Sequence, residues 1–489
     1  MKNKFLLLLF IVLLSSCSNI NNQKNKELNI DFEKIELDNG LDVIFHVDKS
    51  DPVVAVELMV HVGSARETQG RTGFAHLFEH LLFLESENLG KGGLDKMSAR
   101  IGGSGANGST SPDRTNYLQT VPKDALEKMI WAEADKLGWF INTVTIPVLE
   151  KEKQVVKNEK RQSYDNRPYG HNQYVIDKNL YPKDHPYNWQ VIGSLEDLQN
   201  ATLDDVKSFF KKWYVPNNAT LVLSGDIDVD QAKKWVYKYF DEIPRGDQII
   251  PMVKRPGLLL EKKNLYYEDN FAKVPQLTMV WPSVANYHPD SYALEVLTQY
   301  LSDGKSAPLN QVLIDELKVT SNTRMYNYSY ELAGNMQLSV RAFNNVNLEK
   351  VKTGILNAFE KFENEGISEK DLSRIKAGQE TNFYRSLSSV LGKGTNLASY
   401  NIYTGNPGFV TQDIKNTLTV NSKDVMRVYN HYIKDKNYIT TSFVPKNSPE
   451  LALKGSKLAN VVEEKIVIGA ESTFNPNVSS EYKKTSSSF

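Results

Sequence analysis

A pentapeptide with the residue types and spacing of a metal-binding helix reads His76-Leu77-Phe78-Glu79-His80. Side chains four residues apart on a helix project from the same face, so His76 and His80 can hold one Zn²⁺ together. Glu79 lies next to the second histidine, where its carboxylate can reach a water on the metal without being a ligand. These side chains indicate metal-assisted hydrolysis with Glu79 as the acid–base group.

The residues on either side of this motif predict a helix packed on a core. Apolar residues stand at positions 74, 77, 78, 81 and 82, a helical period with one buried face. The chain has eight histidines, and a chance H-x-x-E-H then arises in roughly one chain in a hundred. The order reverses His-Glu-x-x-His and is the inverzincin signature. The alternative is a surface helix that carries two solvated histidines.

A third protein ligand is needed besides an open position for water, and the segment 150–159 offers the best candidate. Glu152 and Glu159 are two helical turns apart and so share a face. Glu159 can ligate the metal, while Glu152 can accept a hydrogen bond from the free N–H of a histidine ligand. The alternative for both is the solvated face of a charged helix.

Four segments, taken in order, resemble the pitrilysin family of zinc metallopeptidases, which includes insulin-degrading enzyme and the mitochondrial processing peptidase. The similarity extends over nearly all of the chain after residue 30. It is carried by the helix at 73–83, by Gly102-Gly103 with Asn107 to Tyr117, by Glu152 to Glu159, and by His185-Pro186-Tyr187 with Ile192-Gly193. We therefore expect the site residues to have the roles that the matching residues have in this family.

The resemblance implies that His76, His80 and Glu159 bind one zinc ion per chain. It implies that Glu79 is the general base and then the proton donor, and that Glu152 supports a ligand. The expected activity is that of a zinc metalloendopeptidase acting on short or unfolded peptides.

An edge strand for the substrate is implied at Asn107 and Gly108, where an extended peptide would be added to the sheet. The family usually has alanine after this asparagine, often followed by an aromatic residue, whereas Gly108 and Ser109 stand here. This smaller pair leaves more room at the edge or makes the strand more flexible.

One family feature is missing from the sequence. Active members usually carry an Arg and a Tyr seven residues apart in a metal-free domain, where they stabilise the oxyanion. Aligned on the segment 313–321, those positions hold Ile314 and Ser321. We therefore expect the metal-bearing subunit of a heterodimer whose second pitrilysin-like subunit supplies Arg and Tyr. A homodimer is the alternative.

Two other classes of function stay open on the sequence alone. The first is a non-catalytic binding or scaffold subunit of a pitrilysin-like complex, although such subunits have typically lost the metal motif. The second is another zinc amide hydrolase, against which the segment from Asn107 to Tyr117 argues.

The N-terminus predicts an extracytoplasmic lipoprotein. Residues 1–16 combine a basic start with a short apolar run, as a signal peptide does. Cys17, the only cysteine, follows Leu-Ser-Ser as in a bacterial lipobox, which predicts its lipidation and a tether over 17–29. Ser18 in place of Asp resembles sorting to the outer membrane, with the chain facing the periplasm or on the cell surface. An ordinary signal peptide with an incidental cysteine is the alternative.

The remaining sequence predicts an α+β fold of two homologous domains, with helices packed on mainly antiparallel sheets as in half of a pitrilysin clamshell. We expect a zinc-binding domain at 30–246, a linker at 247–263, a metal-free domain at 264–470 and a flexible tail at 471–489. The segments that begin at Asp205 and Asp424 repeat a helix–turn–strand unit. A net charge of −1 gives no basic footprint for nucleic acid.

Overall fold

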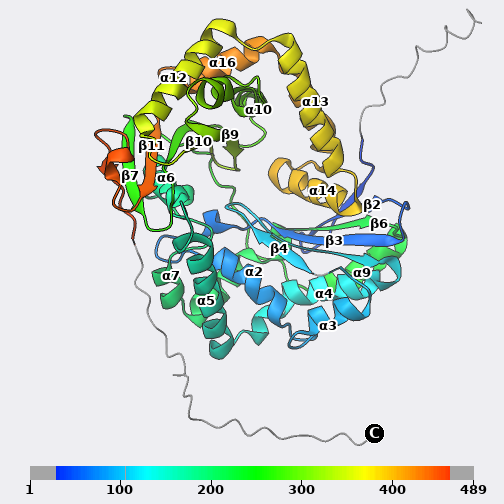
Figure 1. Ribbon diagram of the computed structural model, residues 1–489. Helices are drawn as coiled ribbons and strands as arrows, with labels where there is room; N and C mark the ends of the chain where they lie inside the picture. Colours follow the sequence, from blue (N-terminus) through cyan, green and yellow to red (C-terminus); the bar gives the residue numbers. More distant parts are fainter. Residues whose placement is uncertain (1–28, 105, 463–489) are drawn as a thin grey trace, which may run out of the picture.

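Two six-stranded sheets, each covered by helices, make up the computed structural model (Figure 1), which describes residues 29–104 and 106–462. The predicted signal peptide, Cys17, nearly all of the tether and the tail at 471–489 lie outside the described residues. Among the helices of the described part, none is both long and apolar enough to cross a bilayer.

The first sheet has the strand order β1-β2-β6-β3-β5-β4, in which β2 and β6 are parallel and the other neighbours antiparallel. Its helices bury a large apolar core against the sheet. The strands are β1 (Glu33–Glu36), β2 (Asp42–Val47), β3 (Val53–Val60), β4 (Asn107–Thr110), β5 (Thr115–Pro122) and β6 (Ala219–Gly225). The helices of this half are α2 (Phe74–Leu84), α3 (Gly93–Arg100), α4 (Leu126–Gly138), α5 (Ile146–Lys160), α6 (Asn172–Leu180), α7 (Leu195–Asn200), α8 (Leu203–Trp213) and α9 (Val229–Phe240).

The second sheet has the order β12-β7-β11-β8-β10-β9 and a core of its own. Its strands β7 to β11 are arranged as β2 to β6 are, but the outer strand β12 is parallel to β7, whereas β1 is antiparallel to β2. Its strands are β7 (Lys263–Asp269), β8 (Gln276–Ser283), β9 (Thr320–Ser329), β10 (Gly334–Ala342), β11 (Ile439–Pro445) and β12 (Lys457–Leu458). The helices of this half are α10 (Pro289–Ser302), α11 (Pro308–Asn310), α12 (Leu348–Glu365), α13 (Glu369–Ser386), α14 (Val390–Thr404), α15 (Val410–Thr419) and α16 (Ser422–Tyr432).

The repeat predicted from Asp205 and Asp424 is visible as two matching helix–strand units. Helix α8 leads into β6, and α16 leads into β11, with a capping box at the start of each helix. In each box the cap side chain and the acid three residues later satisfy backbone N–H groups reciprocally, which fixes where the helix begins. The α+β class and the two homologous units are confirmed.

The two halves exchange one helix each. Helix α14, from the second half, packs on the first sheet, where the Ser224 hydroxyl donates to the Val390 carbonyl at 2.7 Å. Helix α6, from the first half, packs on the second sheet, where the Thr441 hydroxyl donates to Asn172 Oδ1 at 2.6 Å. Figure 1 shows α14 over β2 and β6, and α6 beside β7 and β11. The segment 247–263 is irregular up to β7 and separates, along the chain, the strands of the first sheet from those of the second. Each sheet is nevertheless covered by helices from both sides of this segment, because α6 and α14 are exchanged.

Candidate metal centre

Helix α2 carries the H-x-x-E-H motif and is fixed by an aromatic cluster beneath it. Phe74, Leu77, Phe78, Leu81 and Leu82 are buried, as the helical period of the sequence predicts. The Phe78 ring stacks on Phe209 of α8 with centroids 5.6 Å apart and also contacts Tyr214 at 5.0 Å. A helix held this firmly presents its opposite face, with His76, Glu79 and His80, in one orientation.

The N-terminus of α2 is capped by a buried carboxylate that sequence reasoning missed. Glu67 accepts hydrogen bonds from the backbone N–H of Gly73 at 3.0 Å and of Ala75 at 2.9 Å. Gly73 has φ = 89°, a left-handed conformation that favours glycine, and a Cβ there would lie 2.9 Å from the Ile192 carbonyl oxygen. Burial raises the pKa of Glu67 well above its usual range, against the effect of the backbone hydrogen bonds. Glu67 therefore sets the start and direction of the motif helix.

His76, His80 and Glu159 are brought together by α2 and α5. One ligand-type atom from each lies within 4.8 Å of the others. Glu159 Oε2 is 3.1 Å from His80 Nε2 and 3.7 Å from His76 Nε2. A tetrahedral zinc with bonds of about 2.0–2.1 Å places its ligand atoms about 3.4 Å apart. The donor types and their separations fit a zinc ion.

Glu152 lies behind His80, on the side away from Glu159. Its Oε1 is 3.1 Å from His80 Nδ1, and its side chain is buried on α5. The hydrogen bond with Glu152 is the main reason that the pKa of His80 is raised. A carboxylate on Nδ1 leaves Nε2 free to ligate and fixes the plane of the ring.

His76 has a different environment. Burial, followed by the charge of His80, lowers its pKa to about 4, which keeps the imidazole neutral as a ligand must be. Its Nδ1 is buried and has no hydrogen-bond partner within the described part of the chain. The His76 ring is therefore oriented by the side chains packed around it and by its place on the helix face that it shares with His80, and not by a carboxylate at Nδ1.

Glu79 faces the edge strand β4 and meets a hydroxyl there. Thr110 Oγ1 donates to Glu79 Oε2 at 2.5 Å, a contact that sequence reasoning missed. Burial raises the pKa of Glu79, although the Thr110 hydrogen bond works against it. A raised pKa suits a carboxylate that must both take up and release a proton near neutral pH.

The strand β4 is an edge of the first sheet, with pairing to β5 alone among the described strands. Asn107 is exposed, and Gly108 lies next to the general-base candidate. A Cβ on Gly108 would lie 3.0 Å from the Asn116 carbonyl oxygen and 3.2 Å from Glu79 Cγ. The absence of a side chain at Gly108 therefore leaves room beside Glu79.

The positions aligned with the missing Arg and Tyr lie in the second half. Ile314 is half-buried in the wide helical turn Gln311–Glu316, and Ser321 is exposed on β9. The Ile314 side chain has no hydrogen-bond donor, and Ser321 has a short neutral hydroxyl in place of the longer Arg or Tyr side chain.

Comparisons with known proteins match both halves. Residues 42–181, which include all the candidate metal residues, match the profile described as insulinase (peptidase family M16). Residues 200–379 match the profile described as peptidase M16 inactive domain. The zinc protease PqqE of Helicobacter pylori is 29% identical over 417 residues, covering 84% of this chain and 93% of that protein. The mitochondrial-processing peptidase subunit beta of Saccharomyces cerevisiae is 22% identical over 358 residues, covering 70% of this chain and 76% of that one.

Solved structures share the fold. A protease from Helicobacter pylori superposes with a TM-score of 0.78 at 27% identity, covering 86% of this chain and 100% of that one. Pitrilysin superposes with a TM-score of 0.70 at 19% identity, covering 86% of this chain and 45% of that one. The chain thus matches about half of pitrilysin.

Proposed function

This chain belongs to the insulinase (M16) family of zinc peptidases, and we propose that it is itself an active zinc-dependent peptidase. One observation carries the proposal: three ligand-type atoms of His76, His80 and Glu159 converge within 4.8 Å, beside Glu79. The profile described as inactive matches residues 200–379, away from these side chains.

The chemistry would be hydrolysis of a peptide bond. His76, His80 and Glu159 would hold the zinc ion, which as a Lewis acid would lower the pKa of a water and polarise the scissile carbonyl. Glu79 takes a proton from the attacking water and passes it to the leaving amine. The exposed edge of β4 offers backbone groups to an extended substrate, which would be recognised by its shape more than by its sequence.

The test is Glu79→Gln, which keeps size and polarity but removes the base. We expect unchanged zinc content by atomic absorption and a loss of unstructured-peptide hydrolysis of about 10²-fold or more. Glu87→Gln makes the same chemical change at an exposed position shortly after α2 and should leave both readouts unchanged.

Two results would overturn the proposal. A wild-type protein free of zinc after purification and reconstitution would favour the non-catalytic subunit. Hydrolysis of a small amide in preference to the unstructured peptide would favour another zinc amide hydrolase.

We also propose a second pitrilysin-like chain as partner, to supply the Arg and Tyr absent at Ile314 and Ser321. The match to about half of pitrilysin and the name of the yeast relative, a subunit, support this. The pure chain should hydrolyse peptides poorly and gain activity when mixed with such a partner. Full activity of the pure single chain, shown to be monomeric by light scattering, would contradict the assembly, and a fully active homodimer would support the alternative.

The location proposed from the sequence is extracytoplasmic, with a lipid on Cys17 that anchors the chain to the outer membrane. The support is the position of the sole cysteine after Leu-Ser-Ser. Mass spectrometry of the mature N-terminus should find acylated Cys17. An unmodified protein cleaved elsewhere would contradict this.

A further inference from the structure

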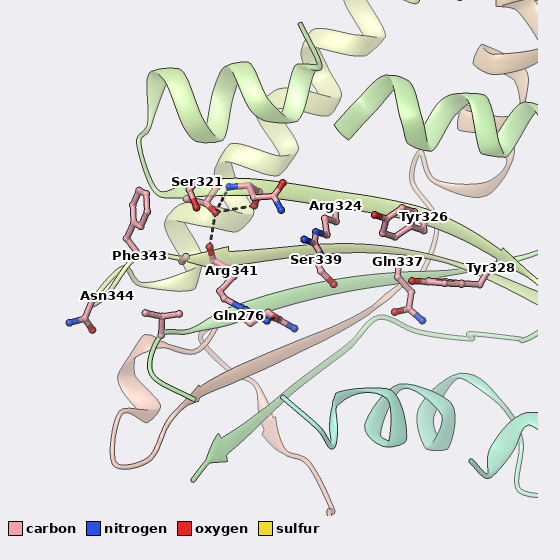
Figure 2. Close-up of a pocket in the computed structure, with 14 residues that line it drawn as sticks. Gln276, Ser321, Arg324, Tyr326, Tyr328, Gln337, Ser339, Arg341, Phe343 and Asn344 are labelled. Carbon is pink, nitrogen blue, oxygen red and sulfur yellow. Dashed lines mark hydrogen bonds between the residues drawn. The ribbon is translucent and has the colours of Figure 1, made fainter. Parts of the chain in front are cut away.

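A cavity of about 550 Å³ opens on the face of the second sheet away from its core, over β9 and β10 (Figure 2). Its lining includes two arginines, Arg324 and Arg341, together with the polar side chains of Gln337 and Ser339. No aspartate or glutamate is among the residues that line it. The cavity therefore has a positive charge that its own walls do not neutralise.

Arg341 is held in place without a carboxylate. Its guanidinium lies 4.3 Å from the centre of the Tyr169 ring and donates to Gln276 Oε1 at 3.2 Å. Tyr169 is fixed in turn, because its N–H donates to Asp269 at 2.6 Å and its hydroxyl to the Val274 carbonyl at 2.8 Å. A guanidinium positioned by a ring face and an amide keeps donors free for an anion.

The pairing of the strands shows which residue of the first sheet corresponds to Arg324. In the first sheet, Asn107 pairs with Leu118, which pairs with Glu57. In the second, Arg324 pairs with Ser339, which pairs with Thr278. Glu57 pairs in turn with Val222 of β6, and Thr278 pairs with Thr441 of β11. Strands β6 and β11 are equivalent in the two sheets. Arg324 is thus the counterpart of Asn107 on the proposed substrate edge.

Both arginines are exposed, and neither is ion-paired within the part of the chain that the structure describes. Because Arg324 pairs with Ser339, and Ser339 and Arg341 are two residues apart on β10, the three side chains share one face. Beside them Tyr326 and Tyr328 are 46% and 38% exposed, with their rings 6.0 Å apart. Exposed aromatic rings next to guanidinium groups suit a peptide with carboxylate side chains.

We propose that this face of β9 and β10 binds acidic residues of the peptide substrate, with Arg324 and Arg341 as the carboxylate-binding groups. The proposal deepens the peptidase function above and rests on it for the identity of the ligand as a substrate. Acidic peptides would be held at the metal-free half while the bond to be cleaved lies at β4.

The test measures binding without turnover. The full chain carrying Glu79→Gln is titrated with a fluorescent peptide of about ten residues, enough to extend along β9 at ~3.3 Å per residue. The peptide is rich in Glu, and a matched peptide has Lys at the same places. We expect the Glu peptide to bind roughly tenfold more tightly, with a preference that weakens as salt is added.

Arg324→Gln with Arg341→Gln should abolish the preference, and Arg324→Lys should keep part of it because charge remains while the planar fork is lost. Arg100→Gln, an exposed arginine on α3, is the matched control and should bind as the parent does. Thermal unfolding of each variant shows whether it is folded. Equal binding of the two peptides, or a preference that survives in the folded double variant, overturns the proposal.

Failure of the peptidase function would be seen separately. A wild-type chain that does not cleave a neutral peptide even when mixed with its pitrilysin-like partner, combined with arginine-dependent binding of the Glu peptide, would remove the hydrolytic role but leave the site.

Discussion

Of the two proposed histidine ligands, His80 is oriented more directly, because Glu152 accepts a hydrogen bond from the ring nitrogen opposite the proposed metal face. His76 has no such partner at Nδ1 among the described residues. A substitution behind the ring should therefore affect zinc binding through His80 more than through His76. Helix α5 contributes both the proposed ligand Glu159 and Glu152, which lies behind His80.

Replacing Glu152 by Gln should weaken zinc binding about 10- to 100-fold, because the carboxylate that orients His80 is lost while the ligands stay. Competition with a chromophoric chelator measures this. Glu150→Gln, on the same helix with an exposed side chain paired to Lys153, is the control. Equal zinc affinity in both variants would show that Glu152 does not position His80.

At the scale of elements, the exchange of α6 and α14 joins the halves by buried polar contacts. Asn401 of α14 donates to Asp42 Oδ2 at 2.8 Å and to Thr220 Oγ1 at 2.8 Å. Its Oδ1 accepts from Lys34 at 2.8 Å. A buried amide whose polar atoms are all hydrogen-bonded locks the helix on the sheet in one register.

Asn401→Ala should lower the free energy of unfolding by about 1–3 kcal/mol, since the buried amide loses its hydrogen bonds to Thr220 and to the Lys34–Asp42 ion pair. Asn396→Ala is the matched control on the same helix, where a half-buried amide donates to the Gly392 carbonyl, and should cost less than about 0.5–1 kcal/mol. Urea unfolding measures both. A loss as small in Asn401→Ala as in the control would mean that packing alone docks α14.

At the scale of the whole molecule, a buried polar network joins the two halves near the start of β5. Asp113 accepts from the Tyr187 hydroxyl at 2.6 Å and from the Glu331 backbone N–H at 2.9 Å. Glu331 lies 2.8 Å from His61 Nε2 and 3.3 Å from Arg66. Burial would raise the pKa of Glu331, but the hydrogen bond with His61 and the charges of His61 and Arg66 lower it.

Burial raises the pKa of Asp113 from 3.8 to about 6. The folded chain therefore binds this proton more tightly than the unfolded chain, and the stabilisation is complete below about pH 4 and is lost between about pH 4 and pH 6. Over that window the wild type should lose on the order of 2–3 kcal/mol relative to Asp113→Asn, which cannot ionise.

Urea unfolding of both proteins at several pH values between these limits checks this expectation. The two proteins differ only at residue 113, so the difference in slope between their stability curves reports the ionisation of Asp113. Parallel stability curves would show that Asp113 titrates with an ordinary pKa.

The sequence by itself determined the features that depend on local spacing. Four residues on a helix put His76 and His80 on one face, and seven put Glu152 and Glu159 on one face, whatever the rest of the chain does. The repeated helix–strand unit predicted two related halves, and the structure has two sheets of equivalent order.

Tertiary structure alone decided the partners that are far apart in the chain. Thr110 reaches Glu79 across 31 residues, and Asn401 reaches Asp42 across 359 residues. The shared face of Arg324 and Arg341 likewise depends on the pairing of β9 with β10. Periodicity shows which face of an element is buried, but the register of strands and the docking of helices result from packing over the whole molecule, which no short stretch of sequence specifies.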